Sequence, residues 1–253
     1  MKPYPITLLI PTYNEADNLK RLLPDMTHFQ EILVVDSYSD DDTVEIARSF
    51  GARVIQRAYQ YSASQKNWAI PQASFEWIFL LDADEWVEDD LIHEIGQVLA
   101  DSQPNNAYDI PRVNYYMGKR IRYSGWQNDS VIRLFKRDSC RYEDKRVHAE
   151  ILTEGKIGRL KNPIHHNTYK NFQHALYKED RYSSWKAHDK VDRGHKSGLL
   201  QMIFRPGFEF FKLYFLRLGI LDGKPGFIIC MMAAWSLFMR QVKIWRIHEG
   251  EQF

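Results

Sequence analysis

A buried strand that runs directly into a cluster of acids constrains this chain more than any other feature. The residues from Trp77 to Leu81 are all apolar, which is typical of a strand buried on both faces. Asp82, Asp84 and Glu85 follow, so three carboxylates gather where that strand would reach the surface. Such acids repel one another unless a cation lies between them, and hard oxygen ligands favour Mg²⁺ or Mn²⁺ over zinc. The alternative interpretation is an acidic loop that caps the next helix.

The first hundred residues alternate short apolar runs with amphipathic stretches. Strands are expected at residues 6–10, 31–35, 53–56 and 77–81. A helical pattern follows each strand, so the order β-α-β-α-β-α-β-α predicts an α/β fold with a doubly wound, mostly parallel sheet flanked by helices. In the second helix, Val44, Ala47 and Phe50 are expected to face inward, with Gly51 ending the helix.

Right-handed crossovers place the carboxyl ends of parallel strands at one edge of the sheet, where ligands bind in such folds. The loops that hold Glu15, Asp36 and residues 82–85 should therefore converge.

The usual nucleotide-binding motifs of α/β proteins are missing from that edge. The loop after the first strand reads PTYNE, and the chain contains neither G-x-G-x-x-G nor G-x-x-x-x-G-K-[ST]. An acidic rim admits a diphosphate through a metal bridge, which leaves a carboxylate to bind ribose or base. Lys66 is either a cation that faces the phosphates or a solvated surface lysine.

Composition sets a few further limits on the 253-residue chain. A net charge of +1 gives no support for a nucleic-acid partner. Only two cysteines occur, Cys140 and Cys230, which excludes a cysteine-based zinc site or a disulfide framework and suits a reducing compartment. The apolar run near the start is too short for a signal peptide, so a cytoplasmic location is expected.

The segment from residue 199 to residue 253 has a different composition from the rest. It contains two apolar, aromatic stretches flanked by Lys and Arg, which predicts an amphipathic helical segment that lies on a membrane surface. The apolar run Phe227–Met239 is about 13 residues long, whereas spanning a bilayer takes about 20, so a peripheral position is expected. The alternative is a helical pair packed on the catalytic domain or on a second subunit.

Four ordered motifs within residues 5–100 resemble the family 2 glycosyltransferases of the GT-A fold. The motifs read LLIPTYNE, VVDSYSDDDT, SQKNWA and LLDADE. The resemblance implies a GT-A domain over residues 1–198, with a nucleotide-binding half at 1–100 and an acceptor half at 107–198. It implies metal-dependent transfer of a sugar from a nucleotide-sugar, usually with inversion at the anomeric carbon, and by analogy favours UDP as the carrier.

Site residues follow from the same resemblance. The residues implied to bind the nucleotide-sugar are Pro11, Thr12, Glu15, Asp36, Lys66, Asp82 and Ala83. Asp36 would lie near the base, Lys66 near the diphosphate, and Asp84 on the Mg²⁺ or Mn²⁺ ion. His165 and His166 are adjacent, and one of them, taken as His166, is expected at the metal; the alternative is a core histidine.

The second half of the chain narrows the resemblance to a small bacterial subgroup. GKRIR, RLF and PIHHNTY are similar to motifs of the subgroup that contains the lipopolysaccharide core β-1,4-glucosyltransferases. That similarity implies an acceptor in the lipopolysaccharide core or another lipid-linked, cell-envelope glycan. The subgroup reads VHE where this chain reads Val147-His148-Ala149, so the acid comes one place later, at Glu150.

Direct inversion needs one general base, which takes the proton of the acceptor hydroxyl. We expect it beyond residue 100, with Glu150 first, Asp129 second, and His148 and Asp144 as further candidates. The alternative for each is a surface ion pair. Four arginines of this half, Arg112, Arg120, Arg122 and Arg133, are either ligands of an anionic acceptor or ordinary surface charges.

Two other functions remain open on the sequence alone. A nucleotidyltransferase acting on a sugar phosphate also uses acids and a metal, but it usually needs a glycine-rich, basic loop where this chain has PTYNE. A non-catalytic, membrane-associated binding protein would be expected to lose the acids, yet Asp36, Asp82 and Asp84 are present.

Overall fold

The computed structural model of the chain describes residues 2–146, 149–169, 171–251 and 253. His148, one of the base candidates, lies outside the described residues. The chain forms two compact units, Met1–Val113 with Asp129–His166, and Asn114–Asn128 with Asn167–Phe253. We call them the sheet unit and the helical unit. The predicted functional boundaries near residues 100 and 198 stay predictions, because compactness alone does not test them.

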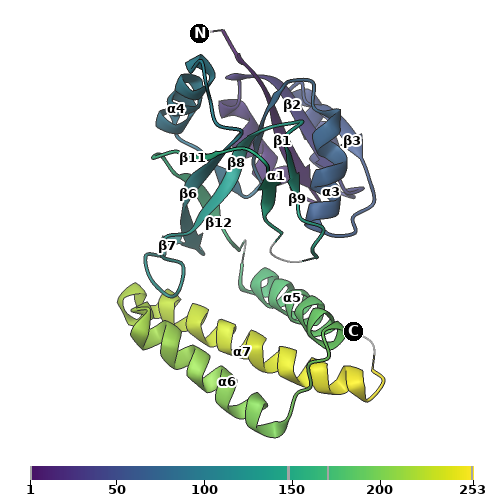
Figure 1. Cartoon of the computed structure of the whole chain (residues 1–253), viewed down its shortest axis with the longest axis vertical. Coiled ribbons are helices and arrows are strands. Elements are labelled where there is room, and N and C mark those ends of the chain that lie inside the picture. Colours follow the sequence, from purple (N-terminus) through teal and green to yellow (C-terminus); the bar gives the residue numbers. More distant parts are fainter. Residues whose placement is uncertain (1, 147–148, 170, 252) are drawn as a thin grey trace. The chain divides into compact units, whose positions relative to one another are not determined.

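The sheet unit begins with the expected alternation of strands and helices (Figure 1). Its first half contains β1 (Tyr4–Thr12), α1 (Ala16–Leu22), β2 (Phe29–Asp36), α2 (Thr43–Ser49), β3 (Arg53–Gln56), α3 (Ser62–Ala69), β4 (Trp77–Leu80), β5 (Glu85–Trp86) and α4 (Asp89–Ala100). Short 3₁₀ turns, Leu23–Asp25 and Ile70–Gln72, follow α1 and α3, and each contains a proline that stops the α-helix. The second half contains β6 (Ala107–Tyr116, whose end belongs to the helical unit), β8 (Ser130–Lys136), β9 (Cys140–Tyr142), β10 (Ile151–Thr153), β11 (Ile157–Arg159) and β12 (Ile164–Asn167).

The strands follow the order β3-β2-β1-β4-β8-β6-β12-β5. Neighbours among β1 to β4 are parallel, whereas β8 is antiparallel to both β4 and β6. The predicted α/β fold with a mostly parallel N-terminal half is confirmed. The antiparallel strands β8 and β12 are the part that alternation alone did not predict, and both contribute to the site described below.

Each face of the sheet is covered by apolar side chains from different helices. Ile6, Leu8 and Ile10 of β1 pack in one buried cluster with residues of α1, α2 and α4. Leu9 points the other way and packs with residues of α3 and the β9–β10 hairpin. This alternation along β1 buries both faces and leaves the strand ends as the place for polar chemistry.

The end of α2 differs from the expectation. Phe50 is 42% exposed rather than inward, because α2 ends at Ser49 and Gly51 turns the chain with a φ of +77°. The predicted role of Gly51 is thereby confirmed, and the inward position of Phe50 is wrong.

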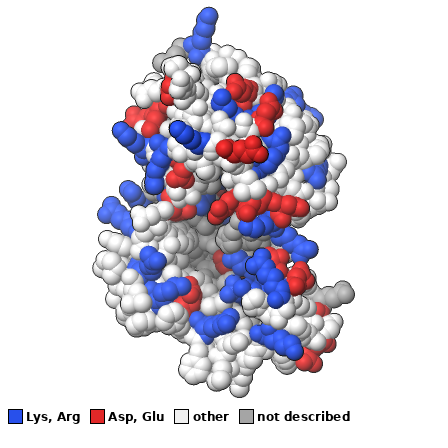
Figure 2. Space-filling view, in the orientation of Figure 1, with Lys and Arg blue, Asp and Glu red and all other residues white. Residues whose placement is uncertain are grey.

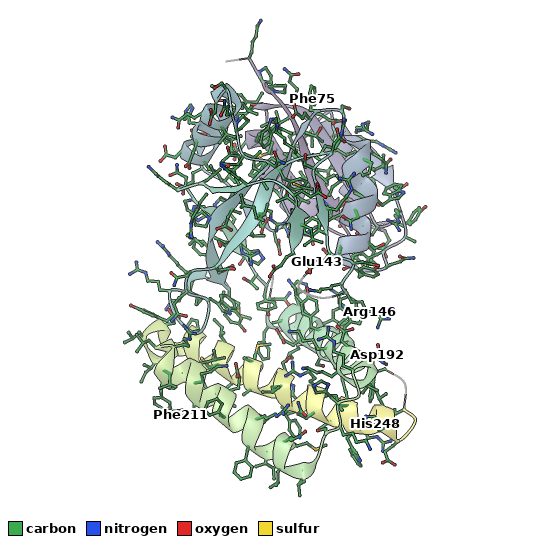
Figure 3. The ribbon with its side chains drawn as sticks, viewed as in Figure 1. Phe75, Glu143, Arg146, Asp192, Phe211 and His248 are labelled. Carbon is green, nitrogen blue, oxygen red and sulfur yellow. The ribbon has the colours of Figure 1, made fainter. Side chains whose placement is uncertain are left out.

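The helical unit consists of β7 (Lys119–Arg120) with the end of β6, and the helices α5 (Phe172–Asp192), α6 (Leu199–Phe211) and α7 (Gly223–His248). A π-helical turn, Lys212–Leu216, and a 3₁₀ turn, Gly219–Asp222, join α6 to α7. Helix α7 packs against both α5 and α6. Asp192 and His248, the last residues of α5 and α7, lie at the same end of the bundle, and α6 runs in the opposite direction (Figures 1 and 3).

Candidate active site

The carboxyl ends of β1 and β2 are joined through a buried carboxylate. Asp36 is fully buried and accepts hydrogen bonds from Thr12 Oγ1 at 3.3 Å, the Ser39 backbone at 2.9 Å and Gln56 Nε2 at 3.0 Å. The Ser39 hydroxyl also donates to it. These donors are uncharged, so among the described residues Asp36 is held in place by neutral groups rather than by a cation.

The loops that follow the two strands are fastened to each other. The Asn14 backbone donates to Ser39 Oγ at 2.9 Å, and the Asp40 backbone donates back to Asn14 Oδ1 at 3.1 Å. The Glu15 backbone donates to Thr43 Oγ1 at 2.8 Å. The convergence of the loops after β1 and β2, expected from the alternation, is present in the structure.

Two tyrosines on these loops were not singled out from the sequence. Tyr13 and Tyr38 are 58% and 59% exposed, each just beyond the end of a buried strand. Tyr38 has a left-handed backbone, with a φ of +59°. An exposed aromatic residue directly after a buried strand is the sequence signal that could have found them.

Three consecutive residues of α3 connect the helix to three different segments. Gln65 Nε2 donates to Ser37 Oγ at 2.7 Å and to the Val35 carbonyl at 3.2 Å. Lys66 Nζ lies 2.9 Å from Asp82 Oδ1. Asn67 exchanges two hydrogen bonds of 2.8 Å with the backbone of Tyr142. The SQKN stretch therefore fixes the positions of β2, the acidic loop and the end of β9.

The acids after β4 lie in a network of alternating charges. The buried Arg133 of β8 donates to both Asp82 and Glu85, the latter at 2.7 Å. Arg112 of β6 lies 3.4 Å from Glu85 Oε1 and donates to Asp129 Oδ2 at 2.8 Å. Burial opposes ionisation of Asp82, but Arg133 and Lys66 hold the pKa of this carboxyl well below its usual range.

This network bears on three interpretations of the sequence. The repulsion between the acids is relieved by Lys66, Arg112 and Arg133, so it is no argument for a metal between Asp82 and Glu85. Lys66 is a buried ion-pair partner rather than a solvated surface lysine. Arg112 and Arg133 hold these carboxylates instead of forming an open patch for an anionic acceptor.

Asp84 and His166 are brought together although they are far apart in the chain. The strand β12 pairs antiparallel with β5, with His166 opposite Glu85 and His165 opposite Trp86. His166 Nε2 then lies 3.5 Å from Asp84 Oδ2. His165 instead stacks on Trp86, with ring centroids 5.3 Å apart, and lies 3.4 Å from Glu88.

A carboxylate beside an imidazole nitrogen can supply two of the ligands of a divalent cation such as Mn²⁺. Among the described residues, no group of three or more His, Cys, Asp or Glu side chains forms a metal site by itself. Asp84 and His166 would therefore hold the ion only together with oxygens of a diphosphate and water, which is the usual way in which Mg²⁺ is bound with substrate phosphates.

The candidates for the general base lie on different parts of the sheet unit. Asp129 accepts from Arg112, and Asp144 accepts from the Tyr61 hydroxyl. Glu150 is exposed, between β9 and β10, and its backbone pairs with that of Glu143 at 2.9 Å. Figure 3 shows Phe75, just before β4, at one end of the sheet unit and Glu143 at the other end, where β4 finishes. The segment that holds Asp144 and Glu150 is thus at the acidic edge, and Figure 2 shows Asp and Glu side chains gathered along that edge.

A mixed sheet with parallel strands β1 to β4, a buried acid at the end of β2, an acidic loop after β4 and no glycine-rich phosphate loop is typical of GT-A-like enzymes. The family model for Glycosyl transferase family 2 matches residues 7–208, and the chain belongs to this family. A lipopolysaccharide core biosynthesis glycosyltransferase, LpsC of Rhizobium meliloti, is 29% identical over 252 residues, covering 96% of this chain and 93% of the relative.

Solved structures with the same fold are more distant in sequence. A mannosyltransferase of Pyrobaculum calidifontis, solved with GDP-Man and Mn²⁺, has a TM-score of 0.55 and 16% identity, covering 99% of this chain and 89% of that one. TarS of S. aureus, residues 1–349 in complex with UDP-GlcNAc, has a TM-score of 0.51 and 13% identity, covering 100% and 93%. The predicted family and GT-A fold are confirmed. The family match favours a glycosyltransferase over the nucleotidyltransferase and the non-catalytic binding protein that the sequence left open.

Proposed function

We propose that this chain is an inverting, metal-dependent glycosyltransferase. It moves a hexose from a nucleotide-sugar, with UDP as the favoured carrier, to a lipopolysaccharide core or another lipid-linked glycan. The observation that carries the proposal is that the buried Asp36 ends β2 and Asp84, paired with His166, follows β4, so that both acids lie at the carboxyl ends of parallel strands of one sheet. The relative LpsC supports the acceptor class, since its name places it in lipopolysaccharide core biosynthesis.

The nucleoside would bind on the loops after β1 and β2. The rings of Tyr13 and Tyr38 are exposed and offer stacking surfaces for the base. Pro11 and Thr12 end β1 and Glu15 follows it, at the same edge of the sheet as the carboxylate of Asp36. Asp36 would accept hydrogen bonds from the base edge. Its carboxylate already accepts four hydrogen bonds from neutral groups, so the base edge would take the place of one of these donors, and no salt bridge would have to be broken.

The diphosphate would lie beside Asp82, Ala83 and Asp84. Lys66 and Arg133 supply positive charge next to Asp82, which keeps this acid ionised and reduces its repulsion of phosphate. A divalent ion held by Asp84 and His166 would supply Lewis-acid stabilisation of the departing diphosphate. The relative mannosyltransferase structure, solved with GDP-Man and Mn²⁺, supports this use of a metal.

Glu150 is the base that we favour among the described residues. Asp129 accepts from Arg112 and Asp144 accepts from the Tyr61 hydroxyl, so each of these carboxylates already holds a hydrogen-bond donor of the protein. Glu150 is exposed, with no side-chain ion pair among the described residues, so it is available to an acceptor hydroxyl. It takes that proton while the sugar bond to the diphosphate breaks.

The helical unit would hold the enzyme on the cytoplasmic face of a membrane. Large apolar side chains at helical spacing along α6 are exposed: Leu200, Ile203, Phe204, Phe208 and Phe211. No residue of α6 is buried, and the surface over α6 in Figure 2 is mostly uncharged with Lys and Arg at its border. An exposed apolar face of this extent marks an interaction surface, and the basic border fits anionic lipid headgroups.

The length of α7 leaves a spanning role to be weighed. The segment Gly219–His248, which comprises the preceding 3₁₀ turn and α7, contains an 18-residue window with a mean hydropathy of 1.4 and is long and apolar enough to cross a bilayer. The apolar run Phe227–Met239 is only part of it. However, Lys243 of α7 is buried and donates to Asp180 of α5 at 2.6 Å. Since α5 carries many charged residues, inserting α7 would draw α5 into hydrocarbon at high cost, so we favour the peripheral position.

The test is turnover of a panel of UDP- and GDP-sugars, with nucleotide release measured in Mn²⁺ and in excess EDTA. One donor is expected to be hydrolysed or transferred, and EDTA to stop the reaction. Asp84→Ala should abolish activity with the fold intact, whereas the exposed Asp89→Ala at the start of α4 should not. Undiminished activity in EDTA would contradict the metal assignment, and no release from any donor would contradict the proposed function.

A further inference from the structure

The helical unit contains a cavity that the donor site does not use. Its volume is about 330 Å³, and all of its lining residues belong to the helical unit. Small-molecule sites begin at about 300 Å³, so the space suits a single sugar ring with one substituent rather than an oligosaccharide.

One wall of the cavity is aromatic. Tyr116, Trp126 and Tyr169 line it, with Tyr116 edge-on to Trp126 at 6.4 Å and to Tyr169 at 5.6 Å between ring centroids. Ile229 and Met232 of α7 complete the apolar part. Flat rings with an adjacent hydroxyl can hold the apolar face of a sugar or the glycerol end of a lipid headgroup.

The other wall carries two cations and two carboxylates whose situations differ. Glu179 accepts from the Tyr169 hydroxyl at 2.8 Å, and Glu209 pairs with Lys212 at 2.6 Å. Lys186 of α5 and Arg240 of α7 have no ion-pair partner within 4.0 Å among the residues that the structure describes. Arg240 Nε is buried and has no hydrogen-bond partner among the described residues.

The pKa shifts of the two cations also indicate that their charges are incompletely neutralised. Burial lowers the pKa of Lys186, Glu179 opposes this effect, and Arg240 nearby lowers the pKa further. Burial and Arg205 lower the pKa of Arg240 against the opposing effect of Glu209, so both half-buried cations are incompletely neutralised and an added anion would stabilise them. Because Lys186 and Arg240 come from different helices, an anion with several oxygens and more than one negative charge suits both of them.

We propose that this cavity binds a phosphomonoester carried on a small hydroxylated group, with the phosphate between Lys186 and Arg240 and the remainder against Trp126 and Tyr169. A phosphomonoester has a charge of about −1.5 to −2 and three acceptor oxygens. Such a group belongs either to a phosphorylated sugar of an acceptor glycan or to a lipid headgroup. The inference deepens the proposed function, because it assigns the acceptor or its membrane to the class of phosphorylated ligands.

The test is calorimetric titration of the full-length protein without donor or metal, so its outcome is independent of sugar transfer. The probes are glucose 6-phosphate and dihexanoyl phosphatidic acid below its micelle concentration, with glucose as the uncharged control. Lys186→Met and Arg240→Gln should each weaken binding by about 10- to 100-fold, since a hydrogen bond to a charged group is lost. Lys190→Met, on the same helix but outside the cavity, should bind as the wild type does.

Binding of glucose 6-phosphate alone supports the site with a sugar phosphate as its source, and binding of phosphatidic acid alone supports it with a lipid headgroup. Binding of neither probe, or equal affinity of Lys186→Met and the wild type, overturns the proposal. Thermal melting of each variant separates loss of the site from loss of the fold. If no nucleotide-sugar is turned over but the phosphate probe binds, the proposed function fails and the cavity assignment stands.

Discussion

The sheet unit and the helical unit place apolar and charged side chains in opposite ways. The sheet unit encloses its apolar residues between sheet and helices and pairs its buried acids with Lys66, Arg112 and Arg133. The helical unit leaves large apolar side chains of α6 exposed and keeps Lys186 and Arg240 without an ion-pair partner among the described residues. The sheet unit thus neutralises its buried acids by itself, whereas the helical unit would gain stability from a surface or an anion that covers these side chains.

The largest effect is expected on the exposed face of α6. Replacing Leu200, Phe204 and Phe208 together with Ser removes three side chains that would each contribute roughly 1.5–3 kcal/mol on burial in lipid. Recovery of the protein with sedimented anionic liposomes should fall by about 10²-fold or more. The wild type should bind less as salt rises, yet still bind, because the charge contribution is screened and the apolar one is not.

The matched control lies in the other unit. Phe50 is similarly exposed, at 42%, but stands alone at the end of α2, so Phe50→Ser should leave liposome binding unchanged. If the triple variant sediments as well as the wild type, the exposed face of α6 is a subunit interface rather than a membrane surface.

A paired substitution should separate the buried charges of the two units. Arg133→Leu leaves Asp82 and Glu85 without their main partner and should lower the free energy of unfolding by roughly 3–5 kcal/mol. Arg240→Leu removes a cation that has no ion-pair partner among the described residues, so it should cost less than about 1 kcal/mol. Urea unfolding of both variants measures the difference, and equal losses would show that the two charges are equivalent.

The exposed acid of the sheet unit should affect catalysis and not stability. Glu150→Gln should lower kcat by about 10²-fold, because the general base is lost, while donor affinity and melting temperature stay unchanged. The control is Glu154→Gln, which lies in the turn after β10. A loss in kcat below about fivefold would reassign the role to Asp129, Asp144 or His148.

The smallest effect concerns pH. Arg133 and Lys66 lower the pKa of Asp82 in the folded chain, relative to about 3.9 in the unfolded chain. The stability that this acid contributes is therefore present above the unfolded pKa. It is lost as pH falls toward the lower folded pKa. Below about pH 5 the melting temperature of the wild type should therefore fall. The melting temperature of Asp82→Asn should fall less steeply over this window, because the variant lacks this carboxyl, which takes up at most one proton per molecule. Parallel curves for the two proteins would remove Asp82 from the acid response.

Local pattern was sufficient for the parallel half of the fold. Apolar runs and intervening helical spacing predicted β1 to β4 and the loops that converge after them, because each strand is a short segment with its own signal. The motifs also identified Asp36, Asp82 and Asp84 as residues of the acidic edge. Gly51 was predicted correctly to end its helix, but Phe50 was placed inward, since periodicity does not tell where the last turn stops.

The partners of the acids could not be predicted in the same way. Arg133 reaches Asp82 because β8 lies antiparallel beside β4, and the register of such a pair cannot be predicted from either strand alone. His166 reaches Asp84 through the pairing of β12 with β5. The sequence therefore showed three acids but not the cations between them, and a metal was inferred from a repulsion that the protein itself relieves.

The late position of β12 has a consequence for how the enzyme is made. The acidic loop after β4 is synthesised early, but its partners Arg133 and His166 follow some fifty and eighty residues later. Contacts of such sequence separation form slowly and only once both segments have left the ribosome. A nascent chain that ends before β12 therefore carries Asp84 without His166. Under the proposed function, the pair that would hold the metal forms only after β12 has left the ribosome.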